Sequence, residues 1–118
     1  MEYKAVYRFA RISARKVRPL ADMIRGKFAD EALEILAYQP QRGARMLEKT
    51  LKSALGNAQD PDHPSNKGRS VNVAGLVVSD AQVDGGPMFK RIRPRARGMA
   101  FMILKRFAHI HVTLQEIE

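Results

Sequence analysis

The sequence contains no cysteine, and it has few acidic residues beside its basic ones. Without cysteine the chain can form no disulfide, no thiolate metal site and no cysteine nucleophile, and nothing indicates an oxidising compartment. No uncharged apolar run is long enough to cross a bilayer, and the stretch MEYKAVYRFA lacks the apolar core of a signal peptide. These absences predict a soluble, unprocessed, intracellular chain that has no membrane partner.

Groupings of residues that support catalysis or bind metals are missing as well. No nucleophile with a neighbouring base and no phosphate-binding loop can be assembled, so we expect neither an enzyme nor a cofactor or small-molecule substrate. His109 and His111 share one strand face, but the spacing offers no third metal ligand. Asp60, Asp62 and His63 lie in a proline-rich turn, where aspartate commonly bonds to its own backbone.

The length and charge of the chain indicate its number of domains and its class of partner. With 118 residues, of which 45% are hydrophobic, residues 1–118 are expected to form a single domain with one core. Lysine and arginine number 21 against 12 aspartate and glutamate, which gives a net charge of +9. Such a balance is typical of proteins that bind polyphosphate, so nucleic acid is the leading partner class.

An N-terminal strand and a first helix are predicted from apolar periodicity. The strand runs from Tyr3 to Phe9, with polar residues between the members of its apolar face: Tyr3, Ala5, Tyr7 and Phe9. The helix is expected to begin after an N-cap at Ser13 and to end at Gly26. Pro19 lies inside it and predicts a kink or a shortened first turn.

Two further helices are expected before the chain changes to strands. Asp30 can cap a short helix that ends before Pro40, and a longer helix runs from about Gln41 to Ala58. One apolar stripe follows the longer helix: Ala44, Leu47, Leu51, Ala54, Leu55 and Ala58. Its other side mixes Glu48 with basic residues, a pattern that favours a solvated surface at least as strongly as contact with RNA, so we assign none of these to a site: Arg42, Arg45, Lys49 and Lys52. The turn-rich segment Asp60–Gly68 marks the change to strands.

Two half-buried strands are predicted in the C-terminal half. The apolar face of the first carries Val71, Val73, Val77, Ala81 and Val83, and that of the second carries Ala108, Ile110, Val112 and Leu114. Roughly twenty residues separate the strands, which is long for an unstructured loop. A hairpin with arms of about eighteen residues would approach 60 Å, whereas a compact domain of this size has a radius of gyration of only ~13 Å. We therefore expect an arm at about 80–106 that protrudes from the body.

The stretch FKRIRPRARG, residues 89–98, gives this arm its charge. From Gly85 to Phe107 the chain has seven basic residues and no acidic one: Lys90, Arg91, Arg93, Arg95, Arg97, Lys105 and Arg106. In an extended chain alternate residues point to the same side, so Arg91 to Arg97 can present a row of guanidinium groups to phosphates. Pro94 cannot donate to a sheet and is expected at a tip or an edge.

Four segments resemble one known family in the right order along nearly the whole chain: RISARKVRPLADMIRGK, EALEIL, GPMFKRIRPRARG and ILKRFAHIHV. They are similar to bacterial large-subunit ribosomal protein twenty-two. This resemblance implies an α+β fold of three helices on a three-stranded antiparallel sheet with a long hairpin. It also implies a cytoplasmic structural protein of the large ribosomal subunit. Its partners would be ribosomal RNA, neighbouring ribosomal proteins and, at the hairpin tip in the exit tunnel, the nascent peptide.

The resemblance and the charge pattern together assign RNA-binding residues. Residues that match the family's motifs are Ser13, Arg15, Lys16, Arg18, Lys27, Lys90, Arg91, Pro94, Arg95, Gly98 and His109. Charge alone adds Arg11, Arg25, Arg93, Arg97, Lys105 and Arg106. A solvated helix face is the alternative around the first helix. However, eight basic residues stand against one acid between Lys4 and Lys27, which favours RNA.

The chain departs from the family pattern on the returning arm. Met99 to Met102 replace a more basic stretch, and Phe107-Ala108 replace a small hydroxylated pair. Residues 99–102 are therefore expected to pack on bases, on a neighbouring protein or on the outgoing arm. The alternative function is a free regulator that uses two helices as a helix-turn-helix. Against it, the densest charge lies on a hairpin rather than on a recognition helix.

Overall fold

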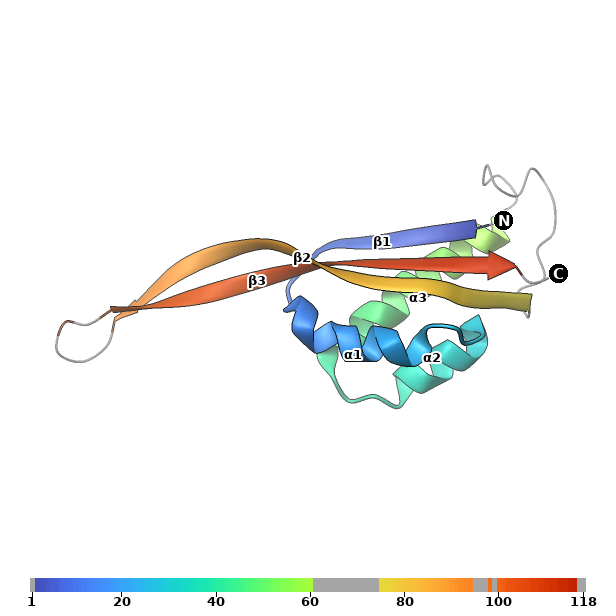
Figure 1. Cartoon of the computed structure of the whole chain (residues 1–118), viewed down its shortest axis with the longest axis horizontal. Helices are drawn as coiled ribbons and strands as arrows, with labels where there is room; N and C mark the ends of the chain where they lie inside the picture. Colours follow the sequence, from blue (N-terminus) through green and yellow to red (C-terminus); the bar gives the residue numbers. More distant parts are fainter. Residues whose placement is uncertain (1, 61–74, 95–97, 99, 117–118) are drawn as a thin grey trace.

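Three helices lie on one face of a three-stranded antiparallel sheet in the computed structural model, which describes residues 2–60, 75–94, 98 and 100–116. The elements are, in chain order, β1 (Glu2–Ala10), α1 (Ala14–Ile24), α2 (Ala29–Ala37), α3 (Arg42–Gln59), β2 (Leu76–Pro94) and β3 (Ala100–Glu116). The strand order is β1-β3-β2, so the last strand lies between the other two (Figure 1). The α+β class predicted from the sequence is confirmed.

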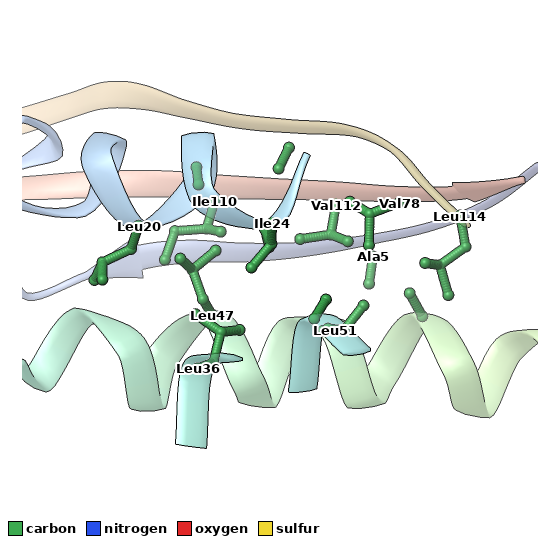
Figure 2. Packing of buried hydrophobic residues seen from close by; sticks show 14 of the residues in the cluster. Ala5, Leu20, Ile24, Leu36, Leu47, Leu51, Val78, Ile110, Val112 and Leu114 are labelled. Carbon is green, nitrogen blue, oxygen red and sulfur yellow. The ribbon is translucent and has the colours of Figure 1, made fainter. Parts of the chain in front are cut away.

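The core fills the layer between the sheet and the helices. Figure 2 shows leucine side chains of the helices directed toward the inner face of the sheet, where Ile110, Val112 and Leu114 lie. The stripe predicted on α3 is buried apart from Leu55, which is partly buried against the core. All four predicted apolar residues of β3, from Ala108 to Leu114, are fully buried.

A bulge in β1 changes which residues face the core. Tyr3 and Ala5 are buried as predicted, but Phe9 is 57% exposed and Ala10 is fully buried. The pairing with β3 shifts register between Tyr7 and Ala10, and Phe9 has a φ of 56°. The extra residue reverses the alternation. The prediction that Phe9 faces the core was therefore wrong.

A second bulge corrects the prediction for β2. Val77 was predicted on the same face as Ala81, but Leu76 and Val78 are the fully buried residues. The register shifts between Val78 and Asp80, which moves the buried face from even to odd positions. The loop after α1 covers this edge strand: the Gly26 N–H donates to the Val78 carbonyl, and the Val78 N–H donates to the Lys27 carbonyl, both at 2.8 Å. Val71 and Val73 lie outside the described residues.

The helix ends follow the sequence signals with one exception. Ser13 occupies the N-cap position of α1 with an extended backbone, although its side chain makes no capping hydrogen bond. Gly26 follows this helix with a φ of 83°, a conformation that glycine adopts without strain. Phe28 is the N-cap of α2, so the predicted cap at Asp30 was wrong by two positions. Most of the segment Asp60–Gly68 lies outside the described residues.

Strands β2 and β3 continue beyond the helices as a paired ribbon (Figure 1). Their pairing runs from Leu76 and Glu116 to Pro94 and Ala100, whereas the last core residues on the two strands are Val83 and Ala108. We call residues 86–107 the arm. Where the structure describes burial in the arm, at residues 86–92, 98 and 104–107, no residue is buried. The longest dimension is 66 Å and the radius of gyration is 17.6 Å, above the ~13 Å of a compact domain of this length.

Candidate nucleic-acid interface

An open groove of about 860 Å³ lies where the arm meets the body. The body contributes Arg11, Ser13, Lys16 and Arg42, and the arm contributes Phe89, Arg91, Leu104, Lys105, Arg106 and Phe107. Six of these ten lining residues are lysine or arginine, and none is acidic. Within the described part of the chain, no ion pair joins any of the six cations to a carboxylate. The groove therefore concentrates uncompensated positive charge, and we call it the cationic groove.

The end of β1 positions one part of the body wall. After the bulge, the Ile12 N–H donates to the Ala10 carbonyl at 2.8 Å, which turns the chain toward α1. The Lys16 N–H donates to the Ser13 carbonyl at 3.2 Å and closes the first helical turn. This short path places Arg11, Ser13 and Lys16 on the groove wall.

His109 holds this bulge in place. Its Nδ1 accepts the backbone N–H of Phe9 at 3.1 Å. The two rings also meet almost perpendicularly, with centroids 5.0 Å apart and an interplanar angle of 83°. Because Nδ1 is an acceptor here, the neutral ring carries its proton on Nε2. His109 was predicted to contact RNA, and the structure gives it an internal bond instead of a place in the groove lining.

Arg42 was not assigned to a site from the sequence, yet it lines the groove. Its Nη2 donates to the Arg11 carbonyl, which fixes the guanidinium group beside the part of the body wall formed by residues 11–16. A glycine makes this approach possible, because a Cβ at Gly43 would meet Val17 Cγ2 at 3.1 Å and two other side chains within 3.3 Å. The available signal was a cation at the first residue of a helix, where the helix dipole disfavours positive charge.

Aromatic side chains occupy the arm wall between the cations. The rings of Phe89 and Phe107 lie 5.2 Å apart at 89°, and the Arg91 guanidinium stands 5.5 Å above the Phe89 ring. Gly86 allows the two strands to approach here, since a Cβ would meet the Phe107 carbonyl oxygen at 3.1 Å. The predicted cations Arg91, Lys105 and Arg106 line this wall, but the phenylalanines were not predicted as site residues.

Two predicted RNA-binding arginines make contacts inside the fold. The Arg18 Nε donates to the Val83 carbonyl at 3.1 Å. Arg25 pairs with Asp22 at 2.7 Å and with Asp80 at 3.9 Å, and it donates to the Ala81 carbonyl. These bonds tie α1 to β2, so both guanidinium groups have a structural role.

The remaining predicted residues are distributed over the surface and the tip. Arg15, Lys27 and Lys90 are exposed but do not line the groove. Arg93 and Pro94 form the last strand pairs of β2, with Phe101 and Ala100 as partners. Gly98 is exposed with a φ of 69°. Arg95 and Arg97 lie outside the described residues, as does Met99.

Neither a metal site nor a membrane span is found in the described part of the chain. Among those residues, no group of three or more histidine, aspartate or glutamate side chains is arranged to hold a metal ion. None of the described helices combines the length and the apolar character needed to cross a membrane.

The chain is similar to known proteins over nearly its whole length. The sequence model of the family "Ribosomal protein L22p/L17e" matches residues 5–115. A protein of Rhodopirellula baltica named large ribosomal subunit protein uL22 is 66% identical over 117 residues, which cover 99% of this chain and 97% of that protein. Proteins of the same name from Caldicellulosiruptor saccharolyticus and Akkermansia muciniphila are 50% and 48% identical, over 97% and 100% of this chain and 88% and 99% of their own lengths. The family is one of structural rather than catalytic proteins, and this chain belongs to the ribosomal protein L22p/L17e family.

Proposed function

We propose that this protein is a structural constituent of the large ribosomal subunit in the cytoplasm, and that it binds ribosomal RNA through the cationic groove and the arm. One observation carries the proposal. Cations from three separate segments, namely residues 11–16, Arg42, and the arm with Arg91, Lys105 and Arg106, converge on one concave surface without an acidic residue in its lining. Such a surface binds the phosphate backbone and gains affinity from released counterions.

The mode of recognition follows from the groups available. Guanidinium groups grip phosphate oxygens in bidentate fashion, and RNA is distinguished mainly by shape, phosphates and 2′-hydroxyls. A helix-turn-helix regulator would instead concentrate base-reading residues on one helix. Here the cations lie on a groove formed by a helix start, a second helix start and two strands, which favours a folded RNA.

The arm is proposed to pass through RNA and to place its tip in the wall of the nascent-peptide exit tunnel. The family resemblance is the main support, together with the strand pairing that continues to Pro94 and Ala100. Neighbouring large-subunit proteins are proposed as further partners. A photoreactive residue at Gly98, in ribosomes that carry a stalled nascent chain, should crosslink to that chain. Crosslinks to RNA alone would argue against a tip in the tunnel.

Salt dependence tests the RNA-binding proposal directly. If on the order of ten phosphates are contacted, log affinity for large-subunit ribosomal RNA should fall with log salt at a slope of about −7 to −9. A slope of about −2 would mean that too few phosphates are contacted. In a lysate, the protein should sediment with the large subunit on a sucrose gradient, and its absence from that peak would contradict the proposal.

A further inference from the structure

The cationic groove contains an aromatic surface that charge alone does not explain. Phe89 is 49% exposed, and both Phe89 and Phe107 line the groove among the cations. Phe89 pairs across the strands with Lys105, and Phe107 lies two residues further along β3. The aromatic surface is therefore flanked by positive charge along the strand and across it.

Packing within the arm accounts for only part of this arrangement. A diagonal aromatic pair stabilises two strands, and the perpendicular contact of Phe89 with Phe107 is such a pair. The pair does not require half of the Phe89 side chain to remain exposed in a groove, nor the Arg91 guanidinium to stand over its ring. Aromatic rings set among lysine and arginine are typical of surfaces that bind single-stranded nucleic acid, where bases stack on the rings.

We propose that the cationic groove binds an unpaired nucleotide of RNA, with its base stacked on Phe89 and its flanking phosphates held by cations of the two walls. The inference rests on the proposed RNA-binding function and specifies its ligand. In a continuous A-form duplex the bases are stacked on one another, so only a bulged, looped or terminal nucleotide can place a base on this ring. Paired RNA would meet the cations but not the phenylalanine.

The position of the groove gives this nucleotide a second effect. Arg11, Lys16 and Arg42 belong to the body, whereas Arg91, Lys105 and Arg106 belong to the arm. A phosphate on each side of the stacked base would neutralise charge on both walls. The bound nucleotide therefore links the arm to the body at the point where the strands leave the core.

A tryptophan placed at position 89 reports on stacking. The chain contains no tryptophan, so Phe89→Trp places its single tryptophan in the groove, where emission can be excited selectively over that of the three tyrosines. The matched control is Phe28→Trp, because Phe28 is 45% exposed, close to the 49% of Phe89, but does not line the groove. The probe is an RNA hairpin with one bulged adenosine. We expect it to quench the emission of the Phe89→Trp variant and to leave the emission of the Phe28→Trp variant unchanged.

The decisive comparison uses a second hairpin of the same charge, in which the bulged position is abasic. Loss of one stacked base should weaken binding to the wild-type protein by roughly five- to 150-fold. The Phe89→Ala variant should bind both hairpins with nearly equal affinity. Equal affinity of the wild type for the two hairpins, or equal quenching of both tryptophan variants, would overturn the stacking proposal.

These outcomes also separate this inference from the proposed function. Strong, salt-dependent binding to both hairpins without selective quenching would reject the stacked base and leave RNA binding intact. Absence of salt-dependent binding would contradict both. In assembled subunits, a photoreactive phenylalanine analogue at position 89 should crosslink to an unpaired nucleotide, whereas a crosslink only to protein would place a protein in the groove and reject the inference.

Discussion

The same two strands have different environments in the body and in the arm. In the body, alternate residues of β2 and β3 enter the core, and Ile110, Val112 and Leu114 are fully buried. In the arm, none of the residues whose burial the structure describes, 86–92, 98 and 104–107, is buried, and Ile92 remains 73% exposed. The two strands remain paired through both regions, with a register shift between Gly85 and Met88, so backbone pairing alone does not explain the difference in burial.

This difference shows what the alternation of a strand encodes. In the body it separates core from solvent, and burial of apolar area supplies the stability. In the arm, the alternation places basic residues on both faces of the strands. An isolated two-stranded ribbon is marginally stable in water. We therefore expect the arm to gain much of its rigidity from a partner, whereas the core stabilises the body.

The largest expected effect on stability comes from a substitution in the core of the body that leaves the arm unchanged. Leu47 is fully buried, so Leu47→Ala should lower the free energy of unfolding by about 2–5 kcal/mol. Its counterpart Ile92→Ala, in the arm, should change it by less than about 0.5 kcal/mol. Urea denaturation of the free protein measures both. A similar loss for Ile92→Ala would show that the arm has a packed interior of its own.

A second prediction concerns the arm side of the cationic groove. The triple variant Arg91→Gln, Lys105→Gln, Arg106→Gln should keep the melting temperature of the free protein but reduce the salt slope of binding to large-subunit ribosomal RNA by about one per lost contact. The control is Lys4→Gln, Lys49→Gln, Lys52→Gln, which removes the same charge outside the groove lining. Equal losses of slope in the two variants would mean that net charge, and not the groove, determines binding.

A third, smaller effect on stability concerns His109, which lies where the arm leaves the body. His109→Leu removes the acceptor for the Phe9 N–H and should cost about 1 kcal/mol of unfolding free energy. His111→Leu is the matched control on the same strand face, where the imidazole only pairs at 3.2 Å with the exposed Asp84, so its cost should be below about 0.5 kcal/mol. Thermal denaturation compares them. Equal costs would remove the structural role assigned to His109.

An effect of similar size is expected at two adjacent glycines where the arm begins. A Cβ at Gly86 would meet the Phe107 carbonyl at 3.1 Å, whereas a Cβ at Gly85 has nothing within 4 Å. Gly86→Ala should therefore lower the free energy of unfolding by about 1 kcal/mol. Gly85→Ala should be neutral or slightly stabilising, because it restricts the unfolded chain. Reversal of this order in calorimetry would indicate that the strands can separate here without cost.

Sequence periodicity predicted the three helices and the inner face of β3, because each depends on a regular pattern over many residues, whereas the α+β class came from the family resemblance. It failed at Phe9 and Val77, since a bulge adds one residue without interrupting the apolar alternation that predicts a strand. It also misplaced the cap of α2, where Phe28 takes the position predicted for Asp30. A pairing partner far along the chain determines a bulge, and a local pattern cannot reveal it.

Charge pointed to several residues that line the cationic groove, but it did not show which arginines make contacts inside the fold. Arg91, Lys105 and Arg106 are in the groove, as expected for a basic interface, whereas Arg18 and Arg25 bond to backbone carbonyls of β2. Arg42 was missed because its position in the groove depends on the close approach of α3 to α1 at Gly43. A guanidinium group can donate hydrogen bonds equally to a backbone carbonyl inside the fold or to a phosphate at the interface. Only three-dimensional neighbours decide between these roles.

The divided origin of the groove has a consequence for assembly. Its walls come from the start of the chain, from the beginning of α3 and from the arm, so the concave surface exists only once the body has folded around all three. An unfolded chain has the same net charge but no groove. A ligand that binds the groove binds the native state and not the unfolded chain, so it stabilises the native state by an amount that increases with the logarithm of its concentration above Kd. Assembly into the ribosome would therefore favour correctly folded chains.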